Sequence, residues 1–529
     1  MHGFASPPRT TTHAEHGMAA TSNRDATRAA LDILKDGGNA MDAAVAAAAV
    51  LAVVEPMSTG IGGDVFCLYA PEGSSRIVAY NGSGRAPRKA DLSWYLERNI
   101  SRIAADSAHA VTVPGCVDAW CRLIDDHGSL GIGEVLQPAI RLAEEGYVIQ
   151  PVIHEAWRAS RPRLAADAHA GRILLVDGDA PEPGAIHTQP LLAATLREIA
   201  ACGRAGFYEG WVAEDIVRRL GELGGLHSME DLAGAAGEYV APICSDVAGY
   251  TVHECPPNGQ GIVALIMMNI LEGCDGTGSD PLSADRIHLA LEAGRLAFRD
   301  RALYVADPAM ADVPVDTLLS PAYTDMLRSH IDPARAMVDL PPAELPATPS
   351  TVYLAVVDRD RNAASFINSL YFAFGSSRVA PKSGVTLQNR GCGFVLAPGH
   401  RNAIAPGKRP MHTIIPAMLT RGDRAVMPFG VMGGDYQPWG HTHVLQNMLH
   451  YGMSPQEALD LPRFCYQDGV AMMEPAIPGH VMHDLANRGH PLGITPEPFG
   501  GGQAVWIDWE KGTLAGGSEP RKDGIALGY

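Results

Sequence analysis

The sequence predicts a protein of the α+β class, with helices through much of the first 340 residues and paired strands around residue 351. Helix patterns that begin at capping residues and stop at glycine or proline carry the first part of this prediction. The strand-like runs 352–357 and 363–369, joined by a turn, carry the second. At 529 residues the chain is too long for one ordinary core, although a single two-lobed unit remains possible.

The composition narrows the class of protein. Apolar residues make up 46% of the chain and charged residues 19%, which gives ample material for a core. The formal net charge of −18 argues against nucleic acids and anionic membranes as partners, because both attract Lys and Arg. The longest nearly apolar stretch, residues 43–54, is too short to span a bilayer.

Targeting signals and cysteines favour the cytoplasm. The first eight residues lack the charged and then apolar layout of a secretory signal. The nine cysteines include no CxxC pair, and an odd number is a poor disulfide framework. We therefore expect reduced thiols and a cytoplasmic location.

Two helices are expected near the N-terminus. The first follows the capping residue Asn23 and covers residues 24–36, where Gly37-Gly38 supplies a positive-φ stop. The second covers residues 39–54 and is apolar almost all round, so it should be buried on every side. It ends at Glu55-Pro56, because a residue before proline avoids the helical region.

A glycine-dense turn, residues 58–64, leads from these helices into a strand-like run over residues 65–69. A dinucleotide-binding fingerprint needs the opposite order, with a strand before the glycines and a helix after them. The glycines are therefore expected to allow close backbone packing rather than to bind a pyrophosphate.

The clearest helix of the middle third covers residues 283–299. His288 and Glu292 are four residues apart on the face opposite its apolar side, a spacing that can bind a metal. Because no third ligand is near, we expect a structural role on a solvated helix face.

Thr351 follows a proline-rich segment, residues 340–350, whose composition is typical of an exposed linker. A threonine hydroxyl is a poor nucleophile unless a base lies beside it. If the chain is cut between Ser350 and Thr351, the new α-amino group, with a pKa of roughly 7.7–8.0, becomes that base. A threonine at the start of a strand is common, so this placement alone gives only a candidate nucleophile.

The surrounding sequence resembles the gamma-glutamyltranspeptidase family from about Met18 to the C-terminus. The matching segments, in the family's order, are residues 37–45, 54–56, 60–66, 113–115, 137–139, 256–261, 307–308, 351–358, 408–413 and 430–434. The resemblance implies the four-layer αββα sandwich of N-terminal-nucleophile hydrolases, with two central sheets between helix layers.

The resemblance also implies roles for individual residues. Thr351 stands where the family has the residue that directs self-cleavage and then acts as nucleophile, with Ser350 before the cut. Ser369 matches a hydroxyl residue that hydrogen-bonds the nucleophile. Gly433 and Gly434 match the pair whose N–H groups form the oxyanion hole, a task for which glycine allows close approach.

Four further residues fall within or near these motifs. His412 and Thr413 occupy the positions of two serines that assist substrate binding in transpeptidases, and only Thr413 keeps a hydroxyl. His441 and His443 could suggest a metal, but we expect them to pack the structure after the glycine turn.

The sequence departs from the transpeptidases where they bind a glutamyl head. The arginine that holds the α-carboxylate falls at Leu92, and the acidic residue that holds the α-amino group falls at Gly393. A zwitterionic head would therefore be poorly paired. Arg85, Arg88 and Arg390 remain as candidates for binding a substrate carboxylate, and solvated surface arginines are the alternative.

Two other departures concern loops. Residues 395–407 are shorter than the lid of many transpeptidases, which favours hydrolysis over transfer to an amine and resembles the lidless acylase and amidohydrolase branch. Arg361 stands where the family usually has glycine, so we expect strain at this hairpin tip.

The resemblance implies a precursor that splits into a large subunit, residues 1–350, and a small subunit, residues 351–529, which stay interleaved and could form a homo-oligomer. It implies an amidohydrolase that works through an acyl-enzyme on Thr351, on a small amide that could carry a carboxylate, without metal or organic cofactor. Two alternatives stay open: a true gamma-glutamyltransferase acting on glutathione, and a non-catalytic scaffold with the same fold.

Overall fold

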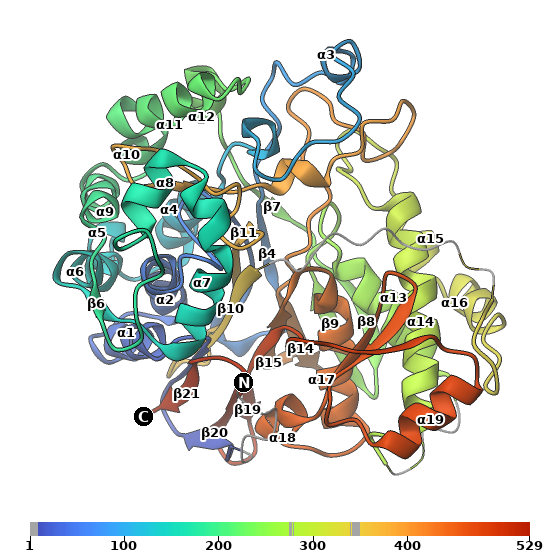
Figure 1. Cartoon of the computed structure of the whole chain (residues 1–529). Coiled ribbons are helices and arrows are strands. Elements are labelled where there is room, and N and C mark those ends of the chain that lie inside the picture. Colours follow the sequence, from blue (N-terminus) through green and yellow to red (C-terminus); the bar gives the residue numbers. More distant parts are fainter. Residues whose placement is uncertain (1–8, 275–277, 279, 339, 341–349) are drawn as a thin grey trace.

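Two seven-stranded sheets lie at the centre of the molecule, and helices cover both outer sides (Figure 1). The computed structural model describes residues 9–274, 278, 280–338, 340 and 350–529. The linker expected over residues 340–350 therefore lies, apart from its two end residues, outside the described residues. The order helix, sheet, sheet, helix agrees with the predicted α+β class and αββα layers.

The first sheet is antiparallel throughout, in the order β21-β2-β10-β11-β3-β4-β7. Its strands are β2 (Met18–Thr21), β3 (Asp64–Ala70), β4 (Val78–Gly82), β7 (Glu238–Val240), β10 (Ser350–Val357), β11 (Ala363–Tyr371) and β21 (Ile525–Gly528). Strands from before and after residue 350 are thus interleaved in one sheet.

The second sheet has the order β1-β20-β19-β15-β14-β9-β8 and is also antiparallel. Its strands are β1 (Thr12–Ala14), β8 (Ile243–Val247), β9 (Tyr250–Glu254), β14 (Ala417–Arg421), β15 (Arg424–Met432), β19 (Gly501–Asp508) and β20 (Thr513–Ser518). It too combines strands from both sides of residue 350. Short strands lie elsewhere, namely β5 (Tyr147–Val148), β6 (Ile186–His187), β12 (Arg378–Val379), β13 (Thr386–Leu387), β16 (Phe464–Gln467), β17 (Val470–Met473) and β18 (Leu492–Ile494).

One helix group, on the left in Figure 1, lies beside the first sheet. It contains α1 (Arg24–Lys35), α2 (Ala40–Val54), α4 (Cys116–His127), α5 (Ile132–Val135), α6 (Gln137–Glu145), α7 (Pro151–Ala165), α8 (Ala168–Leu174), α9 (Pro190–Cys202), α10 (Ala205–Tyr208), α11 (Gly210–Glu222) and α12 (Met229–Ala233). The other group lies beside the second sheet and contains α13 (Gly261–Glu272), α14 (Ala284–Tyr304), α15 (Val315–Leu318), α16 (Pro321–Arg328), α17 (Gln437–Leu449), α18 (Pro455–Asp460) and α19 (Gly479–Asn487). The short α3 (Leu92–Leu96) stands apart at the top of the view.

The side chains of β10 divide between two apolar cores. Val352, Leu354 and Val356 pack with α2 in the core between the first sheet and its helices. The alternate residues Tyr353 and Ala355 join the core between the two sheets. Since successive side chains of a strand point to opposite faces, Thr351 lies on the face that looks toward the second sheet.

The N-terminal helices agree with the sequence prediction. Asn23 caps α1 and Asn39 caps α2 with its side-chain oxygen, each satisfying backbone N–H groups that a helix start leaves open. All fifteen residues of α2 are buried, because this helix lies between α1, α6 and the first sheet. An apolar surface on every side is therefore what its position requires.

The prediction for the middle helix was wrong on exposure. It extends to Tyr304, and both His288 and Glu292 are fully buried instead of lying on a solvated face. His288 hydrogen-bonds His490 at 2.7 Å and the carbonyl of Asp332 at 2.8 Å. Packing on both faces buries this helix, and its polar residues are paired internally, which supports the structural role expected for them.

Backbone packing explains the glycine-dense turn. A Cβ atom at Gly62 would stand 2.3 Å from the carbonyl oxygen of Thr386, and one at Gly63 would stand 2.2 Å from that of Ser369. Only glycine fits at such distances, so the prediction of close packing holds. At the hairpin tip, Arg361 has φ +65°, the left-handed conformation expected to be strained there.

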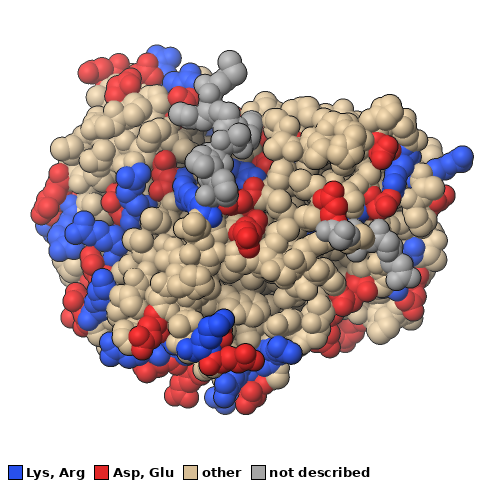
Figure 2. Space-filling view, turned by 90° about the horizontal axis from the view of Figure 1, so that it is seen from below, with Lys and Arg blue, Asp and Glu red and all other residues tan. Residues whose placement is uncertain are grey.

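On the face drawn in Figure 2, acidic and basic side chains are mixed around the rim, and neither sign forms one continuous patch. Among the described residues, helices long and apolar enough to cross a bilayer do not occur.

Candidate active site

Thr351 lies at an irregularity between β10 and β11. Ser350 is opposite Tyr371 and Val352 is opposite Asn368. Thr351 alone is therefore opposite two residues of β11, Ser369 and Leu370, and β11 has one extra residue at this point. Such a bulge bends a strand and redirects its side chains, and bulges are frequent beside active sites. The bulge brings the side chains of Thr351 and Ser369 to the same place.

The hydroxyls of Thr351 and Ser369 are in contact. Their oxygen atoms are 3.0 Å apart, and both residues are buried. Ser369 Oγ also accepts a hydrogen bond from the backbone N–H of Tyr371 at 2.8 Å, which fixes its position. The predicted pairing of these two hydroxyl residues is therefore present in the geometry.

Tyr371 ends β11 in a strained conformation. Its φ is +82°, a region that bulky residues rarely adopt and that costs on the order of 1–3 kcal/mol. Burial first, and then the charge of Asp435, raise the pKa of its hydroxyl, so the hydroxyl stays protonated. Because Tyr371 is paired with Ser350 across the sheet, this strain is stored beside the expected cleavage point.

Arg390 stacks on Tyr371. Its guanidinium carbon lies 3.8 Å from the centre of the Tyr371 ring, and one nitrogen donates to Thr413 Oγ at 2.8 Å. Burial lowers the pKa of Arg390, but arginine remains charged at any working pH. Its Nε and Nη2 atoms are buried and find no hydrogen-bond partner among the described residues. A buried guanidinium with open donors is a ready carboxylate site.

Gln260 connects Thr413 to the glycine turn. Its side-chain nitrogen donates to the carbonyl oxygens of Thr413, at 2.7 Å, and Gly434, at 2.8 Å. Arg301 donates to the side-chain oxygen of Gln260 at 2.6 Å and forms an ion pair with Asp435. These contacts hold the turn at a defined position relative to Arg390.

Gly433 and Gly434 both have positive φ values, +123° and +56°. The turn follows β15 directly and precedes α17, so it stands at the end of a central strand of the second sheet. Tyr353, two residues after Thr351, packs its ring on Gly430, three residues before Gly433. The strand that carries Thr351 and the strand that carries the glycines therefore face each other across the inter-sheet core.

His412 precedes Thr413, but its ring is bound to Asp64 instead of to Thr351 or Arg390. Its Nε2 donates to Asp64 at 3.1 Å, and its Nδ1 accepts from the N–H of Ile414 at 3.3 Å, so both ring nitrogens are used. Asp64 in turn accepts from the backbone N–H of Gly84 and from Gln388, both at 2.9 Å. His412 thus joins its own segment to Asp64, which holds the other two segments, and this use of both ring nitrogens favours a structural role over the substrate contact predicted for it.

A measurable pH dependence follows from this burial. Desolvation first, with Arg390 adding to it, lowers the pKa of His412 to about 4, whereas an unfolded histidine has about 6.5. Between these values the unfolded chain binds more protons, so the stability that neutral His412 contributes is full above pH ~6.5 and is lost as the pH falls toward 4.

We therefore expect His412→Gln to remove part of the acid sensitivity of folding. Between pH 7 and pH 5 the free energy of unfolding should fall by about 2 kcal/mol more in the parent than in His412→Gln. Urea unfolding of an uncleaved Thr351→Ala background measures this difference on a single chain, with the exposed His480→Gln as control. Equal slopes in the parent and in His412→Gln would contradict the assignment.

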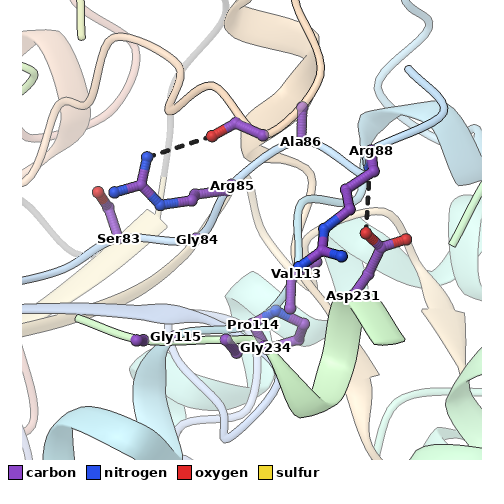
Figure 3. Close-up of a pocket in the computed structure, with 13 residues that line it drawn as sticks. Ser83, Gly84, Arg85, Ala86, Arg88, Val113, Pro114, Gly115, Asp231 and Gly234 are labelled. Atoms are coloured by element: carbon purple, nitrogen blue, oxygen red, sulfur yellow. Dashed lines mark hydrogen bonds between the residues drawn. The ribbon is translucent and has the colours of Figure 1, made fainter. Parts of the chain in front are cut away.

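Arg88 lies beside Asp231, whereas Arg390 lies on Tyr371. Its side chain is exposed and lines a cavity of ~90 Å³ between residues 83–88, 113–115 and 231–236 (Figure 3). Its backbone N–H donates to Asp231 at 3.1 Å. Arg85, in the same cavity, donates to the Gly407 carbonyl and lies 3.7 Å from Asp307. Of the three candidate arginines, Arg390 is the one in contact with the Thr351 neighbourhood.

Leu92 and Gly393, the positions that the sequence matched to the glutamyl-binding residues of transpeptidases, lie near each other in an apolar cluster. Leu92 packs in a small cluster with Phe394 and Cys392, the residues on either side of Gly393. The structure thus gives both positions an apolar surrounding.

The histidines of α17 pack its buried side. His441 Nδ1 lies 2.7 Å from Glu254, and the ring of His443 stands edge-on to Phe464. Across the described ranges, no three His, Cys, Asp or Glu side chains come together as a metal site would require. The sequence did not single out four residues of this site, namely Tyr371, Gln260, Arg301 and Asp435. Only Gln260 lies within a quoted motif, residues 256–261.

The αββα layers, with a buried threonine at the start of a central strand and a neighbouring hydroxyl, define the class of N-terminal-nucleophile hydrolases. Within that class the chain belongs to the gamma-glutamyltranspeptidase family, whose model, described as Gamma-glutamyltranspeptidase, matches residues 26–529. A threonine nucleophile is general for this family, and the chain is a threonine amidohydrolase of that family. The predicted family, fold and enzyme class are thus confirmed.

Individual relatives agree in length and fold. The chain is 38% identical to the glutathione hydrolase-like YwrD proenzyme of Bacillus subtilis, over 95% of this chain and 96% of that one. It is 34% identical to the oxamate amidohydrolase proenzyme of Klebsiella pneumoniae, over 97% of this chain and 98% of that one. The crystal structure of a cephalosporin acylase from Bacillus halodurans superposes with a TM-score of 0.94 at 40% identity, covering 100% of this chain and 99% of that one. These names match the predicted acylase and amidohydrolase-like branch.

Proposed function

We propose that the chain cuts itself between Ser350 and Thr351 and then hydrolyses an amide whose acyl group carries a free carboxylate. The observation that carries this proposal is the hydroxyl contact between Thr351 and Ser369 beside a buried arginine. The guanidinium of Arg390 stacks on Tyr371, near the end of the same strand as Ser369, and has unused donors. The large and small fragments would stay together, because each of the two sheets contains strands from both fragments.

Self-cleavage would begin with attack of Thr351 Oγ on the carbonyl carbon of Ser350. The C–N bond breaks as the acyl group moves to oxygen, and the resulting ester is hydrolysed by water. Ser369 would orient the Thr351 hydroxyl during this step, since its own oxygen is fixed by the N–H of Tyr371. The products are a new carboxyl group at Ser350 and a free α-amino group on Thr351.

The freed α-amino group would then act as the base for turnover. It accepts the proton of Thr351 Oγ as the oxygen attacks the substrate carbonyl, and the N–H groups of Gly433 and Gly434 would stabilise the oxyanion. Collapse of this intermediate expels the amine with a proton and leaves an ester on Thr351. Water hydrolyses that ester, releases the acid and restores the enzyme.

The substrate class follows from charge. Arg390 is the buried cation of the Thr351 group with unused donors, and a carboxylate accepts two parallel hydrogen bonds from a guanidinium. Thr413 would hold Arg390 in place through its hydroxyl. The Klebsiella relative is named for oxamate, an amide with a carboxylate beside it, which supports the same substrate chemistry.

A panel of three anilides of equal chain length tests the substrate class. We expect a glutaryl anilide to be hydrolysed about 100-fold more efficiently, in kcat/KM, than the uncharged pentanoyl anilide, because only glutaryl pairs with Arg390. The γ-glutamyl anilide should be poor, since its ammonium group meets no carboxylate at Gly393. Brisk turnover of the γ-glutamyl anilide, accelerated by an acceptor dipeptide, would show a true transpeptidase instead.

A further inference from the structure

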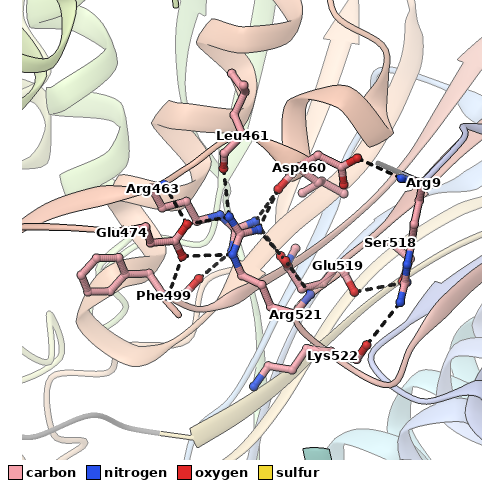
Figure 4. Close-up of polar contacts among 12 residues, drawn as sticks. Arg9, Asp460, Leu461, Arg463, Glu474, Phe499, Ser518, Glu519, Arg521 and Lys522 are labelled. Atoms are coloured by element: carbon pink, nitrogen blue, oxygen red, sulfur yellow. Dashed lines mark hydrogen bonds and ion pairs between the residues drawn. The ribbon is translucent and has the colours of Figure 1, made fainter. Parts of the chain in front are cut away.

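A cluster of four charged side chains, three buried and the fourth, Arg521, 11% exposed, takes no part in the proposed reaction. Arg463, Glu519, Arg521 and Glu474 form a chain of ion pairs of alternating sign beside the end of β20 (Figure 4). Arg463 pairs with Glu519 at 2.5 Å, and Arg521 pairs with Glu474 at 2.7 Å and with Glu519 at 2.8 Å. The side chains of Arg463 and Glu519 have no exposed surface at all.

Glu519 remains ionised inside the protein. Burial alone would raise the pKa of Glu519, but Arg463 and Arg521 lower it to about 2. Removing such ions from water is costly, and a buried ion pair is often no more stabilising than apolar residues of the same size. A role in fixing geometry is therefore a better reason for its presence than stability is.

Three members of the cluster bind the backbone of one short segment, residues 499–502, which we call the strap. Glu474 accepts from the N–H of Phe499 at 3.1 Å, and Arg463 donates to the carbonyl of Phe499 at 2.6 Å. Glu519 accepts from the N–H of Gly502 at 2.8 Å. The strap is thus held at both of its ends by charged side chains.

The strap lies directly on the glycine turn. A Cβ atom at Gly433 would stand 2.8 Å from the Cα of Gly500, and one at Gly500 would stand 2.3 Å from the carbonyl oxygen of Met432. The ring of Phe499 stacks on Tyr436 with centres 5.1 Å apart and planes inclined by 10°. The strap therefore touches the chain immediately before, at and after Gly433-Gly434.

We propose that Arg463, together with Glu519, is a positioning residue for the oxyanion dipeptide Gly433-Gly434, acting through the strap. This proposal rests on the proposed hydrolysis at Thr351. Neither charge touches the reacting atoms. Each fixes the strap, and the strap limits how far the peptide N–H groups of the turn can move from the oxyanion.

Arg463→Lys is the principal test, because it keeps the charge and removes the fork that reaches Phe499 and Glu519 together. We expect kcat for the best anilide to fall by about tenfold, with KM changed less than about twofold, because a misplaced donor weakens only the transition state. Affinity for an alkylboronic acid, which forms a tetrahedral adduct, should weaken by a similar factor. Inhibition by glutarate, which needs no oxyanion, should be unchanged.

Two comparison variants separate positioning from general damage. Arg219→Lys disturbs another buried ion pair, which joins Arg219 on α11 to Asp167 just before α8. The two side chains are 9% and 4% exposed. It should lower the melting temperature and leave kcat unchanged. Phe499→Leu leaves all four charges in place and loosens only the contact with Tyr436, so it gives the same kcat test if Arg463→Lys does not fold.

The outcomes distinguish the positioning role of Arg463 from the proposed hydrolysis at Thr351. If Thr351→Ala still hydrolyses the anilide, the proposed function itself fails. If Thr351→Ala is inactive while folded Arg463→Lys and Phe499→Leu keep the parental kcat and boronate affinity, only the positioning role is overturned. A fall in kcat for Arg219→Lys equal to that for Arg463→Lys would also overturn it.

Discussion

Thr351→Ala is expected to remain a single chain and to lose about 10⁴-fold or more in kcat, because it removes the oxygen that performs both attacks. The parent should yield fragments covering residues 1–350 and 351–529, with threonine as the new N-terminal residue. Intact-mass measurements on freshly purified protein, followed over hours at neutral pH, detect both products. The loss of activity is then read on the anilide panel.

Thr351→Ser is the matched control, because serine keeps the hydroxyl at the same place and drops only a methyl group. It should still cleave and turn over, at a reduced rate. A cleaved and active Thr351→Ala protein would disprove the assignment of the nucleophile. If the parent and Thr351→Ala both stayed whole and inactive, the chain would be a scaffold or a precursor that needs a trigger.

Arg390→Gln should cost about 100-fold in kcat/KM for the glutaryl anilide and leave the pentanoyl anilide nearly unchanged. Two charge-assisted hydrogen bonds to a carboxylate contribute about 2–3 kcal/mol, which is the origin of this factor. Steady-state kinetics of the two substrates on the parent and the variant give the answer. The ratio between the substrates matters most, since a general loss of folding lowers both.

Arg88→Gln is the comparison variant for this prediction. Arg88 was equally a candidate in the sequence, but it lines the cavity beside Asp231 and has no contact with Tyr371 or Thr413. We expect its glutaryl-to-pentanoyl ratio to equal that of the parent. If the glutaryl-to-pentanoyl ratio falls in Arg88→Gln and stays at the parental value in Arg390→Gln, the carboxylate site lies in the cavity beside Arg88.

The sequence by itself determined the local elements and the family. Caps at Asn23 and Asn39 and glycine after α1 are local chemistry, so the helix bounds were readable from neighbouring residues. The alternation of side chains likewise predicted the bounds of β10 and β11 to within two residues. Motifs in the family's order then identified the family. Each motif is a short run of neighbouring residues, so it can be read without knowledge of the fold.

Tertiary structure decided which polar residues meet. Arg88 and Arg390 look alike as sequence, but only Arg390 is buried over Tyr371, because the fold brings the segment after β13 against the end of β11. The sequence placed His288 and Glu292 on a solvated face, since periodicity on one helix does not reveal a second packing partner. The strap on Gly433 joins residues nearly seventy positions apart. Such contacts depend on the packing of distant segments, and no local pattern encodes that packing.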